Sequence, residues 1–96
     1  MWGIFEIKNF DLGDGASCVA FSPDGARIVS GMKDGSVKIW HVQLGVELVT
    51  LPAGRGAVQS VSFSRDGAVI AVVVDGVLNL WDSVAYSVRR AQGGSR

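Results

Sequence analysis

One short unit occurs twice in this sequence, and this repetition constrains the fold most strongly. The segment FSPDG at 21–25 returns as FSRDG at 63–67, and DGSVKIW at 34–40 returns as DGVLNLW at 75–81. The first pair lies 42 positions apart and the second pair 41, because IVSGMKDG is answered by the shorter IAVVVDG. A repeat of this period indicates stacked copies of one supersecondary unit, with the length of four short strands.

Each unit consists of β-strands separated by turns. Strands are expected at 2–10, 19–22, 27–32, 36–41, 46–51, 61–64, 69–74, 77–82 and 85–90. Asp-Gly pairs mark tight turns between them, and no segment has the 3.6-residue period of a helix. The run VIAVVV lacks polar alternation, which predicts a strand that is buried on both faces. The chain is therefore predicted to be all-β, with two four-stranded antiparallel blades of a β-propeller.

The repeat also predicts how the chain is divided. Residues 2–41 form the first blade unit, with its outer strand first in sequence, and residues 46–82 form the second. Residues 83–96 are expected to begin a further outer strand and to end in a flexible basic tail. Two blades cannot close a ring by themselves, because propellers contain about four to eight.

Composition excludes several classes of partner. The formal net charge is zero, which argues against nucleic acid or an anionic membrane as the main partner. No apolar run is long enough for a membrane-spanning helix, and the N-terminus does not resemble a signal peptide. Cys18 is the sole cysteine, which fits a reducing compartment such as the cytoplasm or the nucleus. We interpret it as a small buried apolar residue.

The residues that could carry chemistry have structural explanations. His41 is the sole histidine and has no second ligand at metal-binding spacing. Asp34 and Asp75 each stand in a turn, and the glycines form no phosphate-binding motif. We therefore expect no catalytic residue, no metal and no cofactor.

The repeated residues resemble the WD40 repeat family over nearly the whole chain. In the first unit the matching residues are Val19, Phe21, Ser22, Pro23, Asp24, Gly25, Ile28, Ser30, Gly31, Asp34, Gly35, Val37, Ile39 and Trp40. In the second they are Leu51, Val58, Val61, Phe63, Ser64, Asp66, Gly67, Ile70, Asp75, Gly76, Leu80, Trp81 and Asp82. Because these residues recur at the family's spacing, the resemblance implies that the chain has the propeller fold.

The resemblance also implies a hydrogen-bonded network in each blade, formed by a histidine, an aspartate, a serine or threonine, and the tryptophan. The members present here are Ser30, Asp34, Trp40, Asp75 and Trp81. Both histidines are missing, since Asp11-Leu12 and Ala53-Gly54 stand in their places, and Val72 replaces the serine of the second unit. We expect Trp81 to act mainly as an apolar wedge and the blades to be less stable than is usual in the family.

By resemblance, the function is a non-catalytic scaffold for protein–protein interaction. The family's partner-contacting positions correspond here to Gly15, Ser17, Lys33, Arg55, Ala57, Gln59 and Val74. Lys33 and Gln59 are the strongest candidates, because exposed polar groups there can fix the orientation of a partner.

Two isolated blades would leave two apolar faces without a neighbour. Each face covers roughly 300 Å² from standard strand spacings, and leaving it open forgoes about 8 kcal/mol. The partners expected are therefore other proteins and further blades from the same or another chain. The chain is expected to be a fragment or short member of a larger propeller protein. The alternatives are a unit that assembles with copies of itself, a degenerate remnant, and the accessory propeller of a larger enzyme.

Overall fold

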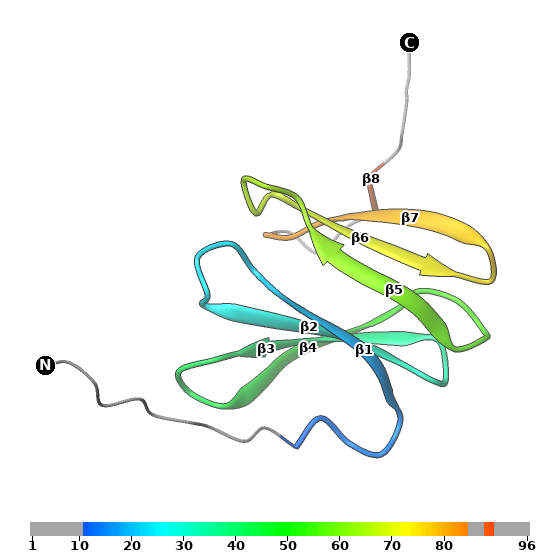
Figure 1. Cartoon of the computed structure of the whole chain (residues 1–96), viewed down its shortest axis with the longest axis horizontal. Coiled ribbons are helices and arrows are strands. Elements are labelled where there is room, and N and C mark those ends of the chain that lie inside the picture. Colours follow the sequence, from blue (N-terminus) through cyan, green and yellow to red (C-terminus); the bar gives the residue numbers. More distant parts are fainter. Residues whose placement is uncertain (1–10, 85–87, 90–96) are drawn as a thin grey trace, which may run out of the picture.

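The computed structural model describes residues 11–84 and 88–89 and places them in two four-stranded sheets (Figure 1). The first sheet contains β1 (Ala16–Phe21), β2 (Arg27–Met32), β3 (Ser36–His41) and β4 (Val46–Pro52). The second contains β5 (Val58–Phe63), β6 (Val69–Val74), β7 (Val77–Asp82) and β8 (Val88–Arg89). Neighbouring strands are antiparallel and follow one another in chain order. The predicted all-β fold of two open blades is confirmed.

The sheets are shifted by one strand from the repeat units of the sequence. The strand expected over 46–51 is β4, and it pairs with β3 to complete the first sheet. The strand expected over 85–90 corresponds to β8, which pairs with β7 in the second sheet. The strand expected over 2–10 lies outside the described residues. Each sheet therefore takes its fourth strand from the segment that follows its Trp-containing strand.

The first strand of each sheet begins earlier than the sequence pattern indicates. β1 starts at Ala16 and β5 at Val58, whereas the expected strands started at 19 and 61. Both strands contain an irregularity in register directly after their first residue. Ser17 and Gln59 stand at these bulges. Because their side chains are polar, the run of apolar residues starts only after them, and the sequence pattern does not indicate the first residues of either strand.

The turn between the first two strands is built identically in both sheets. The Ser22 hydroxyl donates to Asp24 Oδ1 over 2.7 Å, and the Ser64 hydroxyl donates to Asp66 Oδ1 over the same distance. Each carboxylate also accepts a backbone N–H two residues further on, from Ala26 and Ala68. These are Asx-type turns, in which a short acidic side chain replaces a backbone acceptor.

The two sheets pack against each other through their inner faces. The inner face of the first sheet carries Val29, Val37, Ile39 and Leu51, and that of the second carries Val58, Val61, Ile70, Val72, Val74 and Trp81. Gly31 permits the close approach, because a Cβ built there would lie 2.4 Å from Val58 Cγ1. Side chains that alternate with these along the strands form an outer face on each sheet.

Burial on both faces is found in β2 and not, as expected, in β6. Residues Ile28 to Met32 of β2 are all buried. In β6 the inner side chains are buried, whereas Val69, Ala71 and Val73 are only half-buried on the outer face. The prediction for 69–74 was therefore wrong for one face, because no other strand of the described chain covers the outer face of the second sheet.

Within the described ranges, the structure has no helix of the length and apolarity that a membrane span requires.

Candidate partner-binding edge and the tryptophan sites

One edge of the two-sheet unit is formed by three connections that bond to one another. These are the β2–β3 turn at 33–35, the β4–β5 loop at 53–57 and the β6–β7 turn at 75–76. The carbonyl oxygen of Gly35 accepts the backbone N–H groups of Ala53 and Gly54, each over 3.0 Å. A Cβ on Gly35 would lie 2.1 Å from the carbonyl oxygen of Gly54, and its φ is +90°. Glycine is therefore required where these two segments meet.

Asp75 joins the same loop to the second sheet. Its carboxylate accepts the backbone N–H of Arg55 over 3.0 Å and that of Gly56 over 3.1 Å. Asp75 has a φ of +54°, a conformation that few residues other than glycine adopt. In the turn beside it, the backbone N–H of Gly76 donates to Gln59 Oε1 over 3.0 Å. The β4–β5 loop is thus held from both sides by hydrogen bonds.

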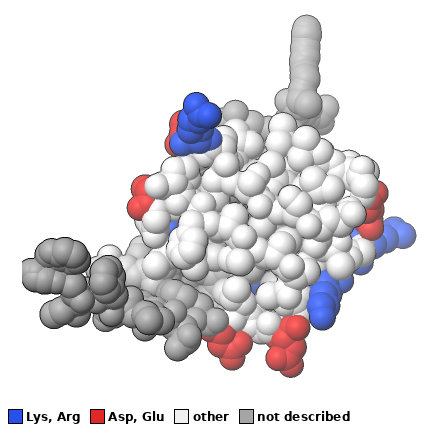
Figure 2. All heavy atoms as spheres, viewed as in Figure 1, with Lys and Arg blue, Asp and Glu red and all other residues white. Residues whose placement is uncertain are grey.

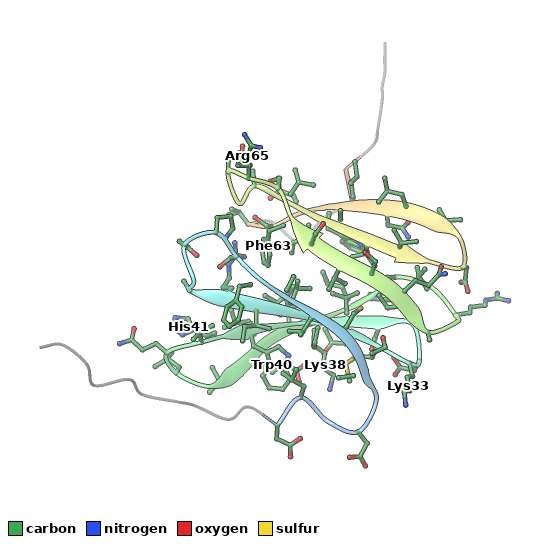
Figure 3. The ribbon with its side chains drawn as sticks, viewed as in Figure 1. Lys33, Lys38, Trp40, His41, Phe63 and Arg65 are labelled. Carbon is green, nitrogen blue, oxygen red and sulfur yellow. The ribbon has the colours of Figure 1, made fainter. Side chains whose placement is uncertain are left out.

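Five of the seven residues predicted to bind partners are exposed, and three of these lie in the turn and loop of this edge. Lys33, Arg55 and Ala57 are all exposed to solvent. Lys33 points away from the sheets in Figure 3, at the opposite end of the strands from Arg65. Gly15 lies beside Lys33, and its carbonyl oxygen accepts the backbone N–H of Lys33 over 2.6 Å. Figure 2 shows that the charged side chains of this view lie around its edge, with uncharged groups in the middle.

The other predicted residues have internal contacts. The Ser17 hydroxyl lies 2.8 Å from the carbonyl oxygen of Val58 and 3.0 Å from that of Gly31, so its single hydrogen can serve only one of them at a time. Gln59 is exposed, but its Oε1 is already bonded to the β6–β7 turn. Val74 is 1% exposed and packs beside Gly54, so its side chain cannot reach a partner. The placement of Val74 at the partner surface is corrected here, because Val74 occupies the side of β6 that faces the core.

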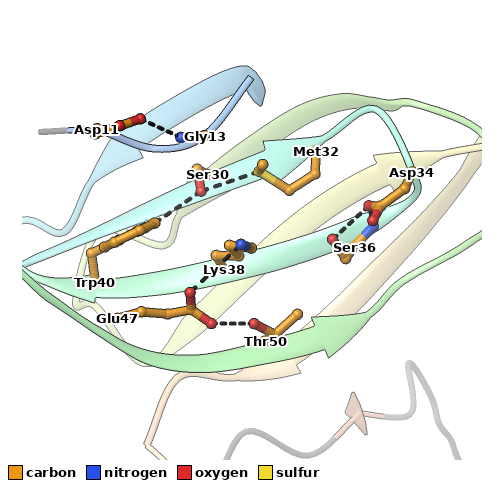
Figure 4. Close-up of polar contacts among 10 residues, drawn as sticks. All are labelled: Asp11, Gly13, Ser30, Met32, Asp34, Ser36, Lys38, Trp40, Glu47 and Thr50. Carbon is orange, nitrogen blue, oxygen red and sulfur yellow. Dashed lines mark hydrogen bonds and ion pairs between the residues drawn. The ribbon is translucent and has the colours of Figure 1, made fainter. Parts of the chain in front are cut away.

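The two tryptophans differ in hydrogen bonding although they occupy equivalent positions. Trp40 Nε1 donates to the buried hydroxyl of Ser30 over 3.0 Å, and Ser30 Oγ lies 3.7 Å from Met32 Sδ (Figure 4). Trp81 is buried, and its Nε1 has no hydrogen-bond partner among the described residues. Val72, which stands in the place of Ser30, offers no acceptor. The prediction that Trp81 acts as an apolar wedge is confirmed.

The structure does not bring the two aspartates to the tryptophans. Asp34 Oδ1 accepts the hydroxyl of Ser36 over 2.6 Å and its backbone N–H over 2.9 Å. These bonds, the hydroxyl first, hold the pKa of Asp34 below its ordinary value of 3.8. Asp75 bonds the β4–β5 loop instead. At Gly54, the position of the family's histidine, a Cβ would lie 2.7 Å from both methyl groups of Val74. The Val74 side chain therefore occupies the space that a histidine would need.

Arg27 connects the two sheets at the end opposite the candidate edge. Its guanidinium donates to the carbonyl oxygen of Ser83 and lies 5.4 Å from the centre of the Phe63 ring. The repeat pattern does not point to this residue, although an arginine that opens the apolar run of β2 is a usable signal. A hollow of about 240 Å³ lies beside it, lined by Ser22, Pro23, Asp24, Arg27, Asp66 and Gly67.

The polar groups of this hollow are already in use. Asp24 and Asp66 accept hydrogen bonds within their own turns, and the bond from Ser22, followed by that from Ala26, lowers the pKa of Asp24.

His41 Nδ1 accepts the backbone N–H of Leu44 over 3.1 Å and thereby stabilises a turn. Across residues 11–84 and 88–89, no three His, Cys, Asp or Glu side chains are grouped as metal ligands.

Comparison with known proteins gives one consistent result. The family model "WD domain, G-beta repeat" matches residues 8–41 and 45–82. "Periodic tryptophan protein 2 homolog" of Dictyostelium discoideum is 38% identical over 71 residues, which cover 71% of this chain and 8% of that protein. "Small ribosomal subunit protein RACK1" of Caenorhabditis elegans is 36% identical over 64 residues, covering 67% of this chain and 19% of that protein. The chain thus spans less than a fifth of these relatives.

Solved structures show the same fold. The β-propeller domain of Cps50 (Swd1) from Myceliophteria thermophila superposes with a TM-score of 0.80 and 28% identity, over 88% of this chain and 27% of that chain. The WD40 repeats of RRP9 superpose with a TM-score of 0.73 and 24% identity, over 93% of this chain and 28% of that chain.

Proposed function

Since the chain belongs to the WD40 repeat family, we propose that it is a non-catalytic scaffold that binds other proteins through the edge formed by residues 33–35, 53–57 and 75–76. One observation carries this proposal. The backbone N–H groups of the β4–β5 loop donate hydrogen bonds to Gly35 on one side and to Asp75 on the other, while Lys33, Arg55 and Ala57 remain exposed. A preorganised loop loses little conformational entropy on binding.

The chemistry of the edge indicates the kind of partner. Lys33 and Arg55 are exposed cations, and the carboxylates nearby already accept hydrogen bonds, that of Asp34 from Ser36 and that of Asp75 from the backbone of the β4–β5 loop. Acidic side chains of a protein partner can bind to the two cations, and the backbone of the loop can contact apolar groups between them. A relative named as a small ribosomal subunit protein supports a role within a larger assembly. We place this chain in the cytoplasm or the nucleus, because its sole cysteine fits a reducing compartment.

Charge reversal at the edge tests this proposal. Proteins captured from the source cells by the unmodified chain are compared with those captured by a Lys33→Glu/Arg55→Glu variant. Arg65→Glu is the matched control, because Arg65 is an exposed cation at the other end of the strands (Figure 3). The proposal predicts loss of specific partners with the double variant and their retention with the control. Capture of the same proteins by all three would contradict it.

A further inference from the structure

The two sheets contact each other through two different surfaces. The inner face of the first sheet presents small and aliphatic residues, such as Gly31 and Val29, and the inner face of the second presents Phe63 and Trp81. Figure 3 shows Phe63 between the sheets, whereas Trp40 lies on the side of the first sheet away from the second. A contact between two unlike surfaces can be repeated indefinitely, because each added unit leaves one of each surface open.

The outer face of the first sheet repeats the inner face of the second. The equivalent pairs are Val19 and Val61, Phe21 and Phe63, Ile28 and Ile70, and Trp40 and Trp81. Val61 is 8% exposed beneath the first sheet, whereas Val19 is 54% exposed and Phe21 is 63% exposed. In the described part of the chain no second sheet packs on Val19 and Phe21, although Ile28 beside them is buried, so this part of the outer face is open to a neighbour.

The outer face of the second sheet in turn repeats the inner face of the first. Ala71 stands where the first sheet has Val29, Leu78 where it has Val37, and Leu80 where it has Ile39. Leu78 is 59% exposed, whereas Val37 is fully buried between the sheets. The chain therefore carries both halves of its own internal contact on its two outer faces.

A pair of residues that meet between the two sheets is replaced, on the outer faces, by a pair of different chemistry in which both members differ. Internally, Arg27 of the first sheet bonds Ser83 and covers the Phe63 ring. The equivalent of Arg27 on the second sheet is Val69, and the equivalent of Ser83 is Val42, whose backbone N–H makes the same bond to the preceding turn. A polar pair inside the chain thus corresponds to an apolar pair on the outer faces, and neither Val69 nor Val42 would meet an unmatched charge.

A second exchange reverses the sizes of two side chains. Internally, Gly31 makes room for Val58. On the outer faces Val73 takes the place of Gly31 and Ala16 takes the place of Val58, so the larger side chain moves to the other partner. A Cβ on Gly31 would lie 2.7 Å from Val58 Cβ, so the sheets must pack slightly farther apart at this point when Val73 faces Ala16.

From these exchanges we propose that a second copy of this chain binds head-to-tail, with the outer face of its first sheet on the outer face of the second sheet of its neighbour. Val69 then packs on Val42 and Phe21 of the next copy, and Val73 packs on Ala16. Repetition closes a ring at about two to four copies, because propellers contain about four to eight blades.

Complementation between two blocked chains tests the proposal. Phe21→Glu blocks the outer face of the first sheet and Leu78→Glu blocks that of the second, both at exposed positions. Each variant alone is expected to be a monomer by sedimentation velocity, and an equimolar mixture is expected to form a one-to-one dimer. A mixture that remains monomeric would contradict the proposal, as would assembly that survives both substitutions. Leu44→Glu in the exposed β3–β4 turn is the control and should assemble like the unmodified chain.

A rescue experiment distinguishes this specific contact from nonspecific association of the apolar faces. Val69→Arg places a charge against Val42 of the next copy and should weaken assembly at least about tenfold. Adding Val42→Ser to the same chain recreates the internal pair of Arg27 and Ser83 between copies and should restore assembly. Circular dichroism confirms folding of each variant, and Phe21→Gln with Leu78→Gln replaces the glutamates if either one unfolds the chain. Failure of the rescue with both variants folded would refute the assigned pairing.

Discussion

At the residue scale, the loss of one hydroxyl explains the difference between the two tryptophan sites. Ser30 accepts the indole N–H of Trp40, and Val72 leaves the indole N–H of Trp81 without a partner among the described residues. A buried donor without a partner costs about 1–3 kcal/mol. This deficit could be predicted from the sequence, because a valine stands where the first unit has serine.

Restoring the hydroxyl should therefore stabilise the second sheet. Val72→Thr keeps the shape of the side chain and adds an acceptor, so we expect the free energy of unfolding to rise by about 1 kcal/mol. Ser30→Ala is the reciprocal change and should lower it by about 1–3 kcal/mol. Urea unfolding measures both. A Val72→Thr variant that is no more stable than the unmodified chain would show that the Trp81 indole N–H already has a partner.

The acidic turn residues give the stability a dependence on pH. Hydrogen bonds lower the folded-state pKa of Asp24 and of Asp34 below 3.8, the value taken for the unfolded chain. Their contribution is therefore complete above the unfolded pKa and is lost as the pH falls through the lower folded pKa. An Asp24→Asn/Asp34→Asn variant should show a flatter fall of unfolding free energy below about pH 4. High salt should leave the difference in place, since local hydrogen bonds are its main cause. Superimposable acid-unfolding curves would contradict this assignment.

At the element scale, turns and strands were the most predictable features. The Asp-Gly pairs mark the β2–β3 and β6–β7 turns, and the strands on either side of these turns were located correctly, whereas β1 and β5 begin three residues earlier than expected. The sequence did not reveal what the elements do to one another. Ser17 bonds Val58 from the neighbouring sheet, and Arg27 reaches Ser83 across the same boundary. Such pairs are far apart in the chain, so no local pattern indicates them.

Gly35 supports the candidate edge in a way that a matched variant can isolate. Gly35→Ala adds a methyl group 2.1 Å from the carbonyl oxygen of Gly54, in addition to the strain of a positive φ. Gly76→Ala imposes the strain alone, because its φ is +72° and nothing lies within 4 Å of the added Cβ. We expect Gly35→Ala to lower the free energy of unfolding by about 1–3 kcal/mol more than Gly76→Ala. Equal losses in a thermal or urea melt would show that the β4–β5 loop does not rest on this turn.

At the scale of the whole molecule, the sequence predicted the open two-blade unit but not the matching of its surfaces. The repeat alone indicated two uncovered faces. The equivalence of Val69 with Arg27, and of Val42 with Ser83, acquires meaning only when the strand register shows which residues face each other. Of the residues predicted to bind partners, Lys33, Arg55 and Ala57 are exposed, whereas Val74 faces the core because the side chains of a strand alternate.

The mass of the unmodified chain in solution tests the central claim most directly. The chain has a mass of 10.1 kDa, and its uncovered faces are the two halves of one contact. Sedimentation equilibrium over a range of concentrations should give a closed assembly of about two to four copies, because a ring leaves no open face. A monomer of 10.1 kDa that unfolds cooperatively at every concentration would contradict the account.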